Sequence, residues 1–192
     1  ELLHASQTLS DFSILSPISS NDNVLNYGFF NKKKIVNKSD KPFKVNWVDG
    51  CTMLLNKKKF KNEVYFDENF FMYLENTDLC MRTLNNGGSI FVVPKAKMIH
   101  HGEKTIDKRF SDEIELSRNW HWMWSKFYYN HKHKGFIWAF FITFPNFFSA
   151  FFKMCFYFLI KKEIKKEIYM MRFKGLLNSY LMKKSFYRPY KK

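Results

Sequence analysis

Apolar and polar stretches alternate along the first half of the chain in a way that predicts an α/β fold. A short helix is expected at the start, followed by an apolar strand over 12–18 that Pro17 ends. The stretch 19–43 is rich in Asn, Ser and Lys, which predicts a loop or lid with little core. One strand is predicted over 45–55, with a bend inside it, and a short basic helix or turn over 57–60.

The pattern continues with a helix, a strand and a long aromatic helix. Asn76 or Thr77 is expected to cap a helix that runs to about Asn86, where Gly87-Gly88 stops it. A strand follows over 89–93 and ends at Pro94, with a short extended piece over 95–101. Residues 110–130 are helical in pattern and very aromatic.

The last third of the chain changes character at Gly135. Residues 136–152 carry no charge, and the apolar run continues to Ile160 with Pro145-Asn146 as a break in its middle. This run is long enough to span a bilayer, and a re-entrant or interfacial helical hairpin fits it equally well. The tail 161–192 holds 11 Lys and Arg against two Glu, a net charge of +9. An anionic membrane surface is the expected partner, and a buried pair of core helices is the alternative.

Overall charge and cysteine content narrow the classes of function. The net charge of +15 favours an anionic partner such as nucleic acid, an acidic membrane or a phosphorylated substrate. Basic residues concentrate after the apolar run and do not interleave with aromatics, so we expect no nucleic-acid partner and keep a basic nucleic-acid-binding protein only as a weaker alternative. The three cysteines form no CxxC pair, which argues against a disulfide framework or a zinc site. The chain opens at Glu1 without an initiator Met, and we expect it to be a fragment.

The segment 66–82 is the strongest candidate for a functional site. It places several carboxylates among aromatic side chains in an otherwise basic protein. Carboxylates beside apolar rings lose hydration energy unless a metal ion, a sugar hydroxyl or an arginine compensates for it. A lone histidine, His100, follows after a Gly-Gly pair and a short apolar run.

Several short motifs together resemble the C-terminal half of a family-2 glycosyltransferase with a GT-A fold, of the rhamnosyltransferase-like subgroup. They are Asp49-Gly50-Cys51, the block 66–82 with its pattern FDENFFMYLENTDLCMR, Gly87-Gly88, Pro94-Lys95-Ala96 and His100. The resemblance implies a partial GT-A mixed sheet with flanking helices over 1–134, forming the acceptor-side part of a catalytic domain. Residues 135–192 would then be a membrane-associating helical hairpin with a basic tail.

The resemblance also implies an activity: inverting transfer of a sugar from a nucleotide-diphosphate donor to a cell-surface glycan or a polyprenyl-linked acceptor. A base must remove the proton of the acceptor hydroxyl, and a divalent cation, Mn²⁺ or Mg²⁺, supports the leaving diphosphate. The family usually has a Glu-Asp pair where this chain has Glu75-Asn76, and an amide cannot act as that base. Glu75 is therefore the expected base, with Asp78 as the alternative. His100 is the expected metal ligand, with His101 as a weaker substitute.

Other candidates each have a plainer structural alternative. Arg82 either contacts a phosphate or pairs with Asp78 one helical turn away, and Arg118 either faces a diphosphate or lies on a solvated helix face. Asp49 and Gly50 would either line the acceptor pocket or only shape the sheet. Trp47 and Tyr73 would either stack on a sugar ring or pack in the core. Asn76 is the remaining substrate-binding candidate. The expected location is the cytoplasmic face of the inner (plasma) membrane, peripheral or re-entrant. A non-catalytic, degenerate transferase is the alternative function.

Overall fold

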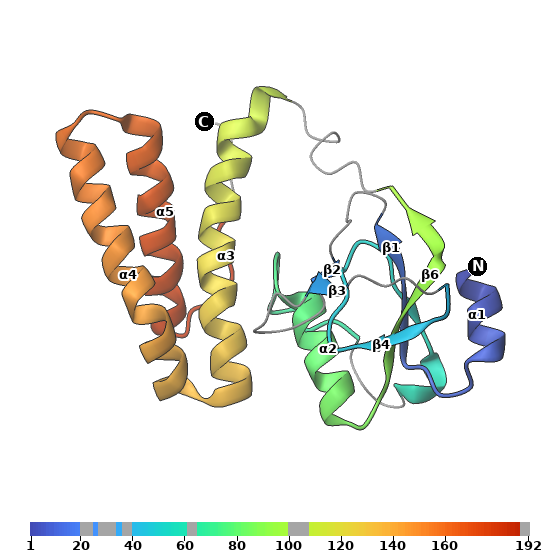
Figure 1. The fold of residues 1–192 in the computed structure, drawn as a ribbon. Helices are drawn as coiled ribbons and strands as arrows, with labels where there is room; N and C mark the ends of the chain where they lie inside the picture. The colour runs from blue at the N-terminus through green and yellow to red at the C-terminus, as the bar shows by residue number, and fades with distance from the viewer. Residues whose placement is uncertain (20–24, 27–33, 36–39, 61–64, 100–107, 189–192) are drawn as a thin grey trace. The chain divides into compact units, whose positions relative to one another are not determined.

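The computed structural model describes residues 1–19, 25–26, 34–35, 40–60, 65–99 and 108–188 (Figure 1). The chain forms two compact units. The first contains Glu1–Asp67 and Glu75–Gly102, and the second contains Glu68–Leu74 and Glu103–Lys192. The long aromatic helix, which was assigned from the sequence to the catalytic part ending at 134, packs within the second unit.

A four-stranded sheet forms the centre of the first unit. Its strands are β1 (Ile14–Ser19), β4 (Phe43–Val45), β5 (Leu54–Leu55) and β6 (Ile90–Met98), in the order β4-β6-β1-β5. The two central strands, β1 and β6, are parallel, and each outer strand is antiparallel to its neighbour (Figure 1). This small mixed sheet with helices packed on it confirms the fold class predicted from the sequence, which is α/β.

The single strand predicted over 45–55 is wrong. Its ends belong to two strands on opposite edges of the sheet, β4 and β5, and residues 46–53 between them are irregular. Residues 46–53 lead from one edge of the sheet to the other, from Val45 beside Ile90 to Thr52 beside Met98, which a continuous strand cannot do. The bend predicted at Asp49-Gly50 lies in this crossing segment.

Both prolines that were expected to end strands lie inside them. Pro17 is in β1 and Pro94 is in β6, so the separate extended piece after Pro94 is the continuation of one strand. Pro17 pairs with Val93 whereas Ile18 pairs with Lys97, so the register shifts at these prolines. A proline is tolerated in a strand at such an irregularity because the ladder there needs no N–H from it.

Shorter elements complete the first unit. Helix α1 (Leu2–Thr8), the 3₁₀ turn η1 (Lys57–Lys59) and helix α2 (Glu75–Asn85) agree with the sequence predictions, and Gly87 follows α2 at φ +74°. The region predicted as a loop or lid, 19–43, contains one short antiparallel pair, β2 (Leu25–Asn26) with β3 (Lys34–Ile35), and its other residues lie largely outside the described part.

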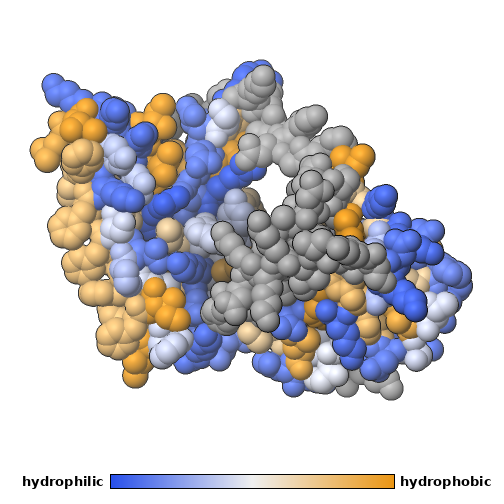
Figure 2. Space-filling view, in the orientation of Figure 1, coloured by the Kyte–Doolittle hydropathy of each residue, from blue (hydrophilic) through white to orange (hydrophobic). Residues whose placement is uncertain are grey.

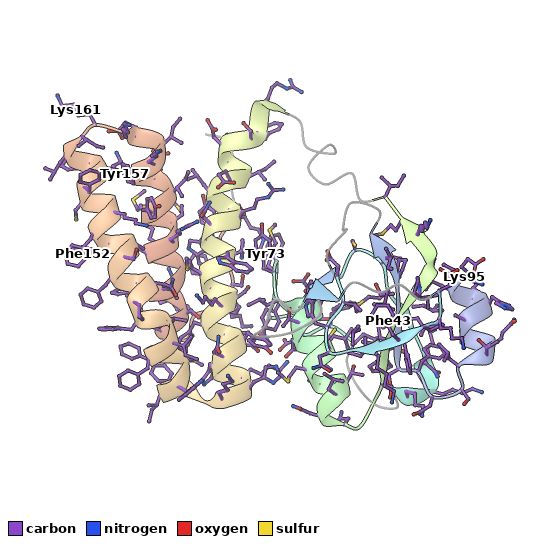
Figure 3. The ribbon with its side chains drawn as sticks, viewed as in Figure 1. Phe43, Tyr73, Lys95, Phe152, Tyr157 and Lys161 are labelled. Carbon is purple, nitrogen blue, oxygen red and sulfur yellow. The ribbon has the colours of Figure 1, made fainter. Side chains whose placement is uncertain are left out.

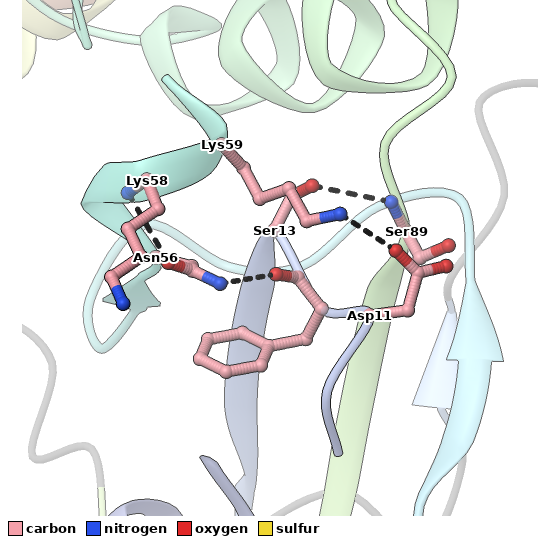
Figure 4. A network of polar contacts seen from close by, with 7 residues as sticks. Asp11, Ser13, Asn56, Lys58, Lys59 and Ser89 are labelled. Carbon is pink, nitrogen blue, oxygen red and sulfur yellow. Dashed lines mark hydrogen bonds and ion pairs between the residues drawn. The ribbon is translucent and has the colours of Figure 1, made fainter. Parts of the chain in front are cut away.

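A polar network fastens η1 to the start of the central strands (Figure 4). The Asn56 side chain donates to the Phe12 carbonyl (3.0 Å) and accepts from the Lys58 backbone N–H (3.2 Å). Lys59 forms an ion pair with Asp11 (2.8 Å). The apolar core lies beneath this network, around the fully buried side chains of Ile14, Leu79, Ile90 and Val92.

Three helices form the second unit: α3 (Ser111–Lys134), α4 (Phe136–Leu159) and α5 (Glu163–Tyr180). Gly135, at φ +84°, makes the sharp turn from α3 to α4. At Gly175, α5 approaches α3 so closely that a Cβ atom would collide with the Trp120 carbonyl oxygen. The helical tail predicted after residue 160 is present as α5.

Helix α4 is continuous through Pro145, so the break predicted there is wrong. Packing against two other helices supplies the stability that a proline removes from an isolated helix. On the packed side, the Thr143 hydroxyl lies 3.0 Å from the Tyr180 hydroxyl, and Lys126 donates to the Asn146 side chain (2.8 Å). The hairpin in the structure is therefore apolar α4 with basic α5.

The outer side of α4 is a wide apolar surface. Figure 2 shows hydrophobic residues gathered along this helix, and Phe152 points outward in Figure 3. The helix is long and apolar enough to cross a membrane, yet only 17% of its most apolar window is buried in the protein. Its exposed large side chains include Ile137 (73%), Phe141 (68%) and Phe152 (63%). Exposed apolar area of this extent marks an interaction surface.

Candidate functional site

Two residues with unusual backbone conformations precede α2. Tyr73 and Leu74 have φ values of +69° and +67°, and Glu75 is the first residue of the helix. Such conformations cost on the order of 1–3 kcal/mol for each residue, and they persist where the surrounding structure enforces them. The chain thus enters α2 through a strained turn, which determines where the Glu75 side chain begins.

Glu75 holds a carboxylate oxygen that is buried but unsatisfied. Its Oε2 atom is shielded from solvent and has no hydrogen-bond partner among the described residues. Leaving a carboxylate oxygen in this state is costly, so such atoms are rare in folded proteins unless a ligand or a reaction uses them. Among the predicted site residues in the described part of the chain, Glu75 is the one with a side-chain oxygen that is both buried and without a hydrogen-bond partner.

Asp78 is placed very differently from Glu75. Its side chain is completely buried, and its Oδ2 atom accepts from the Arg82 Nε at 2.9 Å. Arg82 also donates to the Tyr65 carbonyl oxygen (2.6 Å). The pairing predicted between these two residues is present, and it ties α2 to the loop at Tyr65. This geometry gives Asp78 and Arg82 a structural role in the first unit.

The Asn76 side chain joins α2 to the segment 46–53, which connects β4 with β5. It is 8% exposed, and its Nδ2 atom donates to the Val48 carbonyl oxygen at 2.9 Å. Gly50 lies so close that a Cβ atom there would be 3.1 Å from the Asn76 Cβ. The predicted helix cap is therefore wrong: Asn76 lies inside the helix and donates to a neighbouring strand connection.

Trp47 and Thr77 form a second link between the same two segments. The Trp47 Nε1 atom donates to the Thr77 hydroxyl (3.0 Å), and the indole packs against the core of the first unit. Thr77 is buried inside the helix and is not its cap. Trp47 thus packs in the core, which was the alternative to stacking on a sugar. Asp49 and Gly50 beside it are exposed.

The predicted metal site is not assembled by the described residues. Within the part of the chain that the structure describes, no three His, Cys, Asp or Glu side chains are grouped so that they could hold a metal ion. His100 and His101 lie outside that part. The donor set around Glu75 therefore does not fit a cation by itself, and His100 as a ligand stays a prediction.

A separate cavity of about 400 Å³ lies in the second unit. Its lining comes from α3, α5 and the short segment before α2: Tyr73, Glu115, Arg118, Asn119, Trp122 and Arg172. Small-molecule sites in proteins range from about 300 to 1,000 Å³. Two of the predicted site residues, Tyr73 and Arg118, are therefore brought together in one cavity.

A hydrogen-bonded chain fixes one of the two arginines of this cavity. Asn119 is 6% exposed, donates to the Glu115 Oε1 atom (2.7 Å), and accepts from the Arg172 Nε atom (2.6 Å). The Arg172 guanidinium also lies over the Tyr169 ring, 5.3 Å from its centroid. Its terminal nitrogens keep further N–H donors in a fixed orientation.

Aromatic rings form the other wall. Tyr73 and Trp122 meet edge to face, with centroids 5.4 Å apart, and Trp122 is 42% exposed. Sequence reasoning missed Glu115, Asn119, Trp122 and Arg172 as site residues. The spacing of Glu115, Asn119 and Trp122 along one helix face was visible, but nothing in the sequence indicated that Arg172 lies opposite them.

Parts of the chain are similar to proteins named rhamnosyltransferases. The chain is 36% identical over 63 residues to the N-acetylglucosaminyl-diphospho-decaprenol L-rhamnosyltransferase of Mycobacterium tuberculosis, a match that covers 33% of this chain and 20% of that protein. It is 32% identical over 77 residues to rhamnosyltransferase WbbL of Escherichia coli K12, covering 40% of this chain and 28% of that protein. No family model matches the chain, and no solved structure matches it.

The chain is related over part of its length to glycosyltransferases, and it spans between a fifth and a third of the curated relatives that it matches. The similarity supports a transferase with a partial α/β transferase fold, as the sequence motifs predicted.

Proposed function

We propose that this chain is the acceptor-side part of an inverting glycosyltransferase with a GT-A fold. It would transfer a sugar, rhamnose or another hexose, from a nucleotide-diphosphate donor to a cell-surface glycan or a lipid-linked acceptor. The unsatisfied, buried oxygen of Glu75 carries the proposal. Relatives whose names include rhamnosyl transfer, and in one case a diphospho-decaprenol, support this chemistry.

In the proposed mechanism, Glu75 acts as the general base. Its carboxylate takes the proton from an acceptor hydroxyl while that oxygen bonds to the anomeric carbon of the donor sugar. The bond from that carbon to the nucleoside diphosphate breaks, and the diphosphate leaves with the electron pair. Attack from the opposite face inverts the configuration. Asp78 is excluded from this step by its burial and its Arg82 partner.

A divalent cation, Mn²⁺ or Mg²⁺, belongs to the proposal through the resemblance alone. Such an ion would neutralise charge on the leaving diphosphate, and His100 would be one ligand. The described residues do not assemble its site, so the base chemistry of Glu75 is the step that the structure supports.

We propose that α4 lies along the cytoplasmic face of the plasma membrane as a peripheral, in-plane helix. Its apolar side is exposed, while α3 and α5 pack along the other side and carry many charged residues. A single span through the bilayer would bury those charges in hydrocarbon, which costs about 2.5–3.5 kcal/mol for each central Lys or Arg on the translocon scale. In-plane binding leaves them in water.

Interfacial groups at both ends of α4 support its contact with a membrane. Near the turn to α5, Lys153 lies over the Tyr169 ring (5.2 Å), and Lys165 lies over the Tyr157 ring (5.4 Å). At the other end, Lys134 lies over Trp138 (5.7 Å). Tyr157 and Lys161 are close to the turn in Figure 3. Lysines beside Tyr and Trp are typical of contact with an anionic headgroup layer.

A non-catalytic, degenerate transferase is the second candidate. Asn76 replaces the usual second carboxylate, and its amide is used to hold Val48. In this case the chain would keep the fold and the membrane surface but lack turnover.

One substitution separates the two candidates. Glu75→Gln in the natural full-length protein should lower transfer from a panel of UDP- and dTDP-sugars by about 10²–10⁴-fold, since that is what a general base contributes. Glu68→Gln is the matched control, because Glu68 is an exposed acid of the same segment. Equal activity of the two variants would refute the role of Glu75, and the absence of turnover in the unsubstituted protein would favour the degenerate candidate.

A further inference from the structure

We propose that the cavity between α3 and α5 binds the diphosphate of a lipid-linked acceptor, an inference that rests on the proposed glycosyl transfer. The cavity presents two guanidinium groups, Arg118 and Arg172, against one carboxylate, Glu115. Arginine recognises phosphate groups through paired, charge-assisted hydrogen bonds. A diphosphate offers enough oxygens to engage both arginines at once.

The cavity is built to hold one arginine in place. Arg172 has its Nε–H bonded to buried Asn119, and Asn119 is itself held by Glu115. The carboxylate of Glu115 therefore orients Asn119 and, through Asn119, Arg172. Because the arginine side chain is already ordered, less conformational entropy is lost when its remaining N–H groups bind an anion.

The aromatic wall suits a sugar next to that diphosphate. Tyr73 and Trp122 present ring surfaces to the cavity, and the C–H faces of sugar rings are apolar. From Tyr73 the chain reaches Glu75 through a single intervening residue. A sugar of the acceptor would therefore be held by a residue that stands only two positions before the proposed base in the sequence.

The lipid part of such an acceptor has a natural place on the same helical unit. Helix α4 exposes a broad apolar side that we assign to the membrane surface, and α3 and α5 pack directly against α4. An amphiphile with its chain in the bilayer carries its diphosphate at the headgroup level. A soluble nucleoside diphosphate would also satisfy the arginines, so the experiment must separate these two sources.

Farnesyl diphosphate in neutral detergent micelles is a suitable probe for the chain of 192 residues. Binding is measured by calorimetric titration at about 0.15 M salt, where distant surface charges are screened. Arg118→Ala with Arg172→Ala should weaken binding by at least about tenfold, because two charged hydrogen-bonding groups are lost. The control, Lys174→Ala with Lys184→Ala, removes the same charge from exposed positions and should change affinity by less than about twofold.

A second pair keeps the test valid if the alanine variant misfolds. Arg118→Lys with Arg172→Lys retains the charge but lacks the planar, paired donors, and should still lose most of the affinity. Far-ultraviolet circular dichroism checks that all variants are folded. Equal losses in the Arg118→Ala, Arg172→Ala variant and in the Lys174→Ala, Lys184→Ala control, or no loss in either, would overturn the proposal. Tighter binding of UDP than of farnesyl diphosphate, abolished by the same arginine variant, would assign the cavity to the donor and overturn the acceptor assignment.

These measurements do not depend on turnover. Glu75→Gln should bind farnesyl diphosphate like the unsubstituted chain, because Glu75 does not line the cavity. If Glu75→Gln abolishes transfer while the arginine variant binds the lipid normally, the proposed function stands and this inference fails. If the arginines are needed for binding in a protein without transferase activity, the cavity is a site for a lipid diphosphate and the proposed function fails.

Discussion

Replacing Asn76 with aspartate would introduce the acidic residue that family-2 glycosyltransferases usually have in the motif that this segment resembles, yet the structure predicts that it damages the fold. The Nδ2 atom of Asn76 donates to the Val48 carbonyl oxygen at 2.9 Å, in a site where the residue is 8% exposed. An ionised carboxylate cannot donate, so two oxygens would face each other there. Asn76→Asp therefore exchanges a hydrogen bond for a repulsive contact.

The expected magnitude follows from three contributions. Losing the hydrogen bond and leaving a charged group without a donor costs about 2–4 kcal/mol in total. The position is at the start of α2, where the helix dipole returns about 0.3–1 kcal/mol. Glu75 and Asp78 nearby add repulsion. We expect a net loss of about 2–3 kcal/mol at pH 7, opening α2 and the segment around Val48.

The pH dependence identifies the cause. Burial and the facing carbonyl raise the pKa of the introduced carboxyl above its value in the unfolded chain, so the folded state holds the proton at a higher pH. The protonated form can donate to Val48. The deficit should therefore be small below about pH 4 and grow by at most about 1.4 kcal/mol per pH unit as the pH rises towards the folded-state pKa.

Hydrogen exchange of the α2 amides measures this local stability. Asn85→Asp is the control, since Asn85 is exposed on the same helix and its substitution should change exchange by less than about 1 kcal/mol. Equal protection of α2 in Asn76→Asp and in the unsubstituted chain at pH 7 would refute the reasoning. A deficit that does not shrink in acid would also refute it.

Three further predictions concern separate parts of the chain. Burial lowers the pKa of His121 from 6.5 to about 4. The free energy of unfolding of the helical unit should therefore be highest above pH 6.5, and it should fall by at most about 1.4 kcal/mol per pH unit between pH 6.5 and pH 4. Urea unfolding at pH 7.5 and 5 tests this, and His121→Gln should flatten the difference. Phe141→Lys with Phe152→Lys should reduce flotation with anionic vesicles at least about tenfold, and unchanged flotation would exclude α4 as the membrane surface. Burial raises the pKa of Cys80 to about 11, so iodoacetamide should label exposed Cys51 and spare Cys80, and labelling of both in the folded chain would contradict that burial.

Elements with local signals were predictable from the sequence. Helix α2 has glycines at its end, and α3, α4 and α5 follow long helical patterns. The strands were less accessible. Nothing local shows that Val45 and Leu54 belong to opposite edges of a sheet, because strand order is decided by distant pairing. Pro17 and Pro94 suggested strand ends, whereas a register shift accommodates both.

The candidate site was predictable in part for the same reason. The pairing of Asp78 with Arg82 follows from helical spacing and is present. Asn76 and Trp47 each bond to a partner about 30 residues away, Val48 and Thr77, and helical spacing does not indicate such pairs. The arginine cavity needed the packing of α5 on α3, since Arg172 and Asn119 are 53 positions apart.

Gly175 has no functional group, yet it sets the distance between the two helices that carry the cavity. Because a methyl group there would strike the Trp120 carbonyl, Gly175→Ala must push α5 away from α3. Arg172 lies one helical turn before Gly175, so that movement would separate it from its partner Asn119. The affinity of this cavity for an anion would thus depend on the lack of a side chain at position 175.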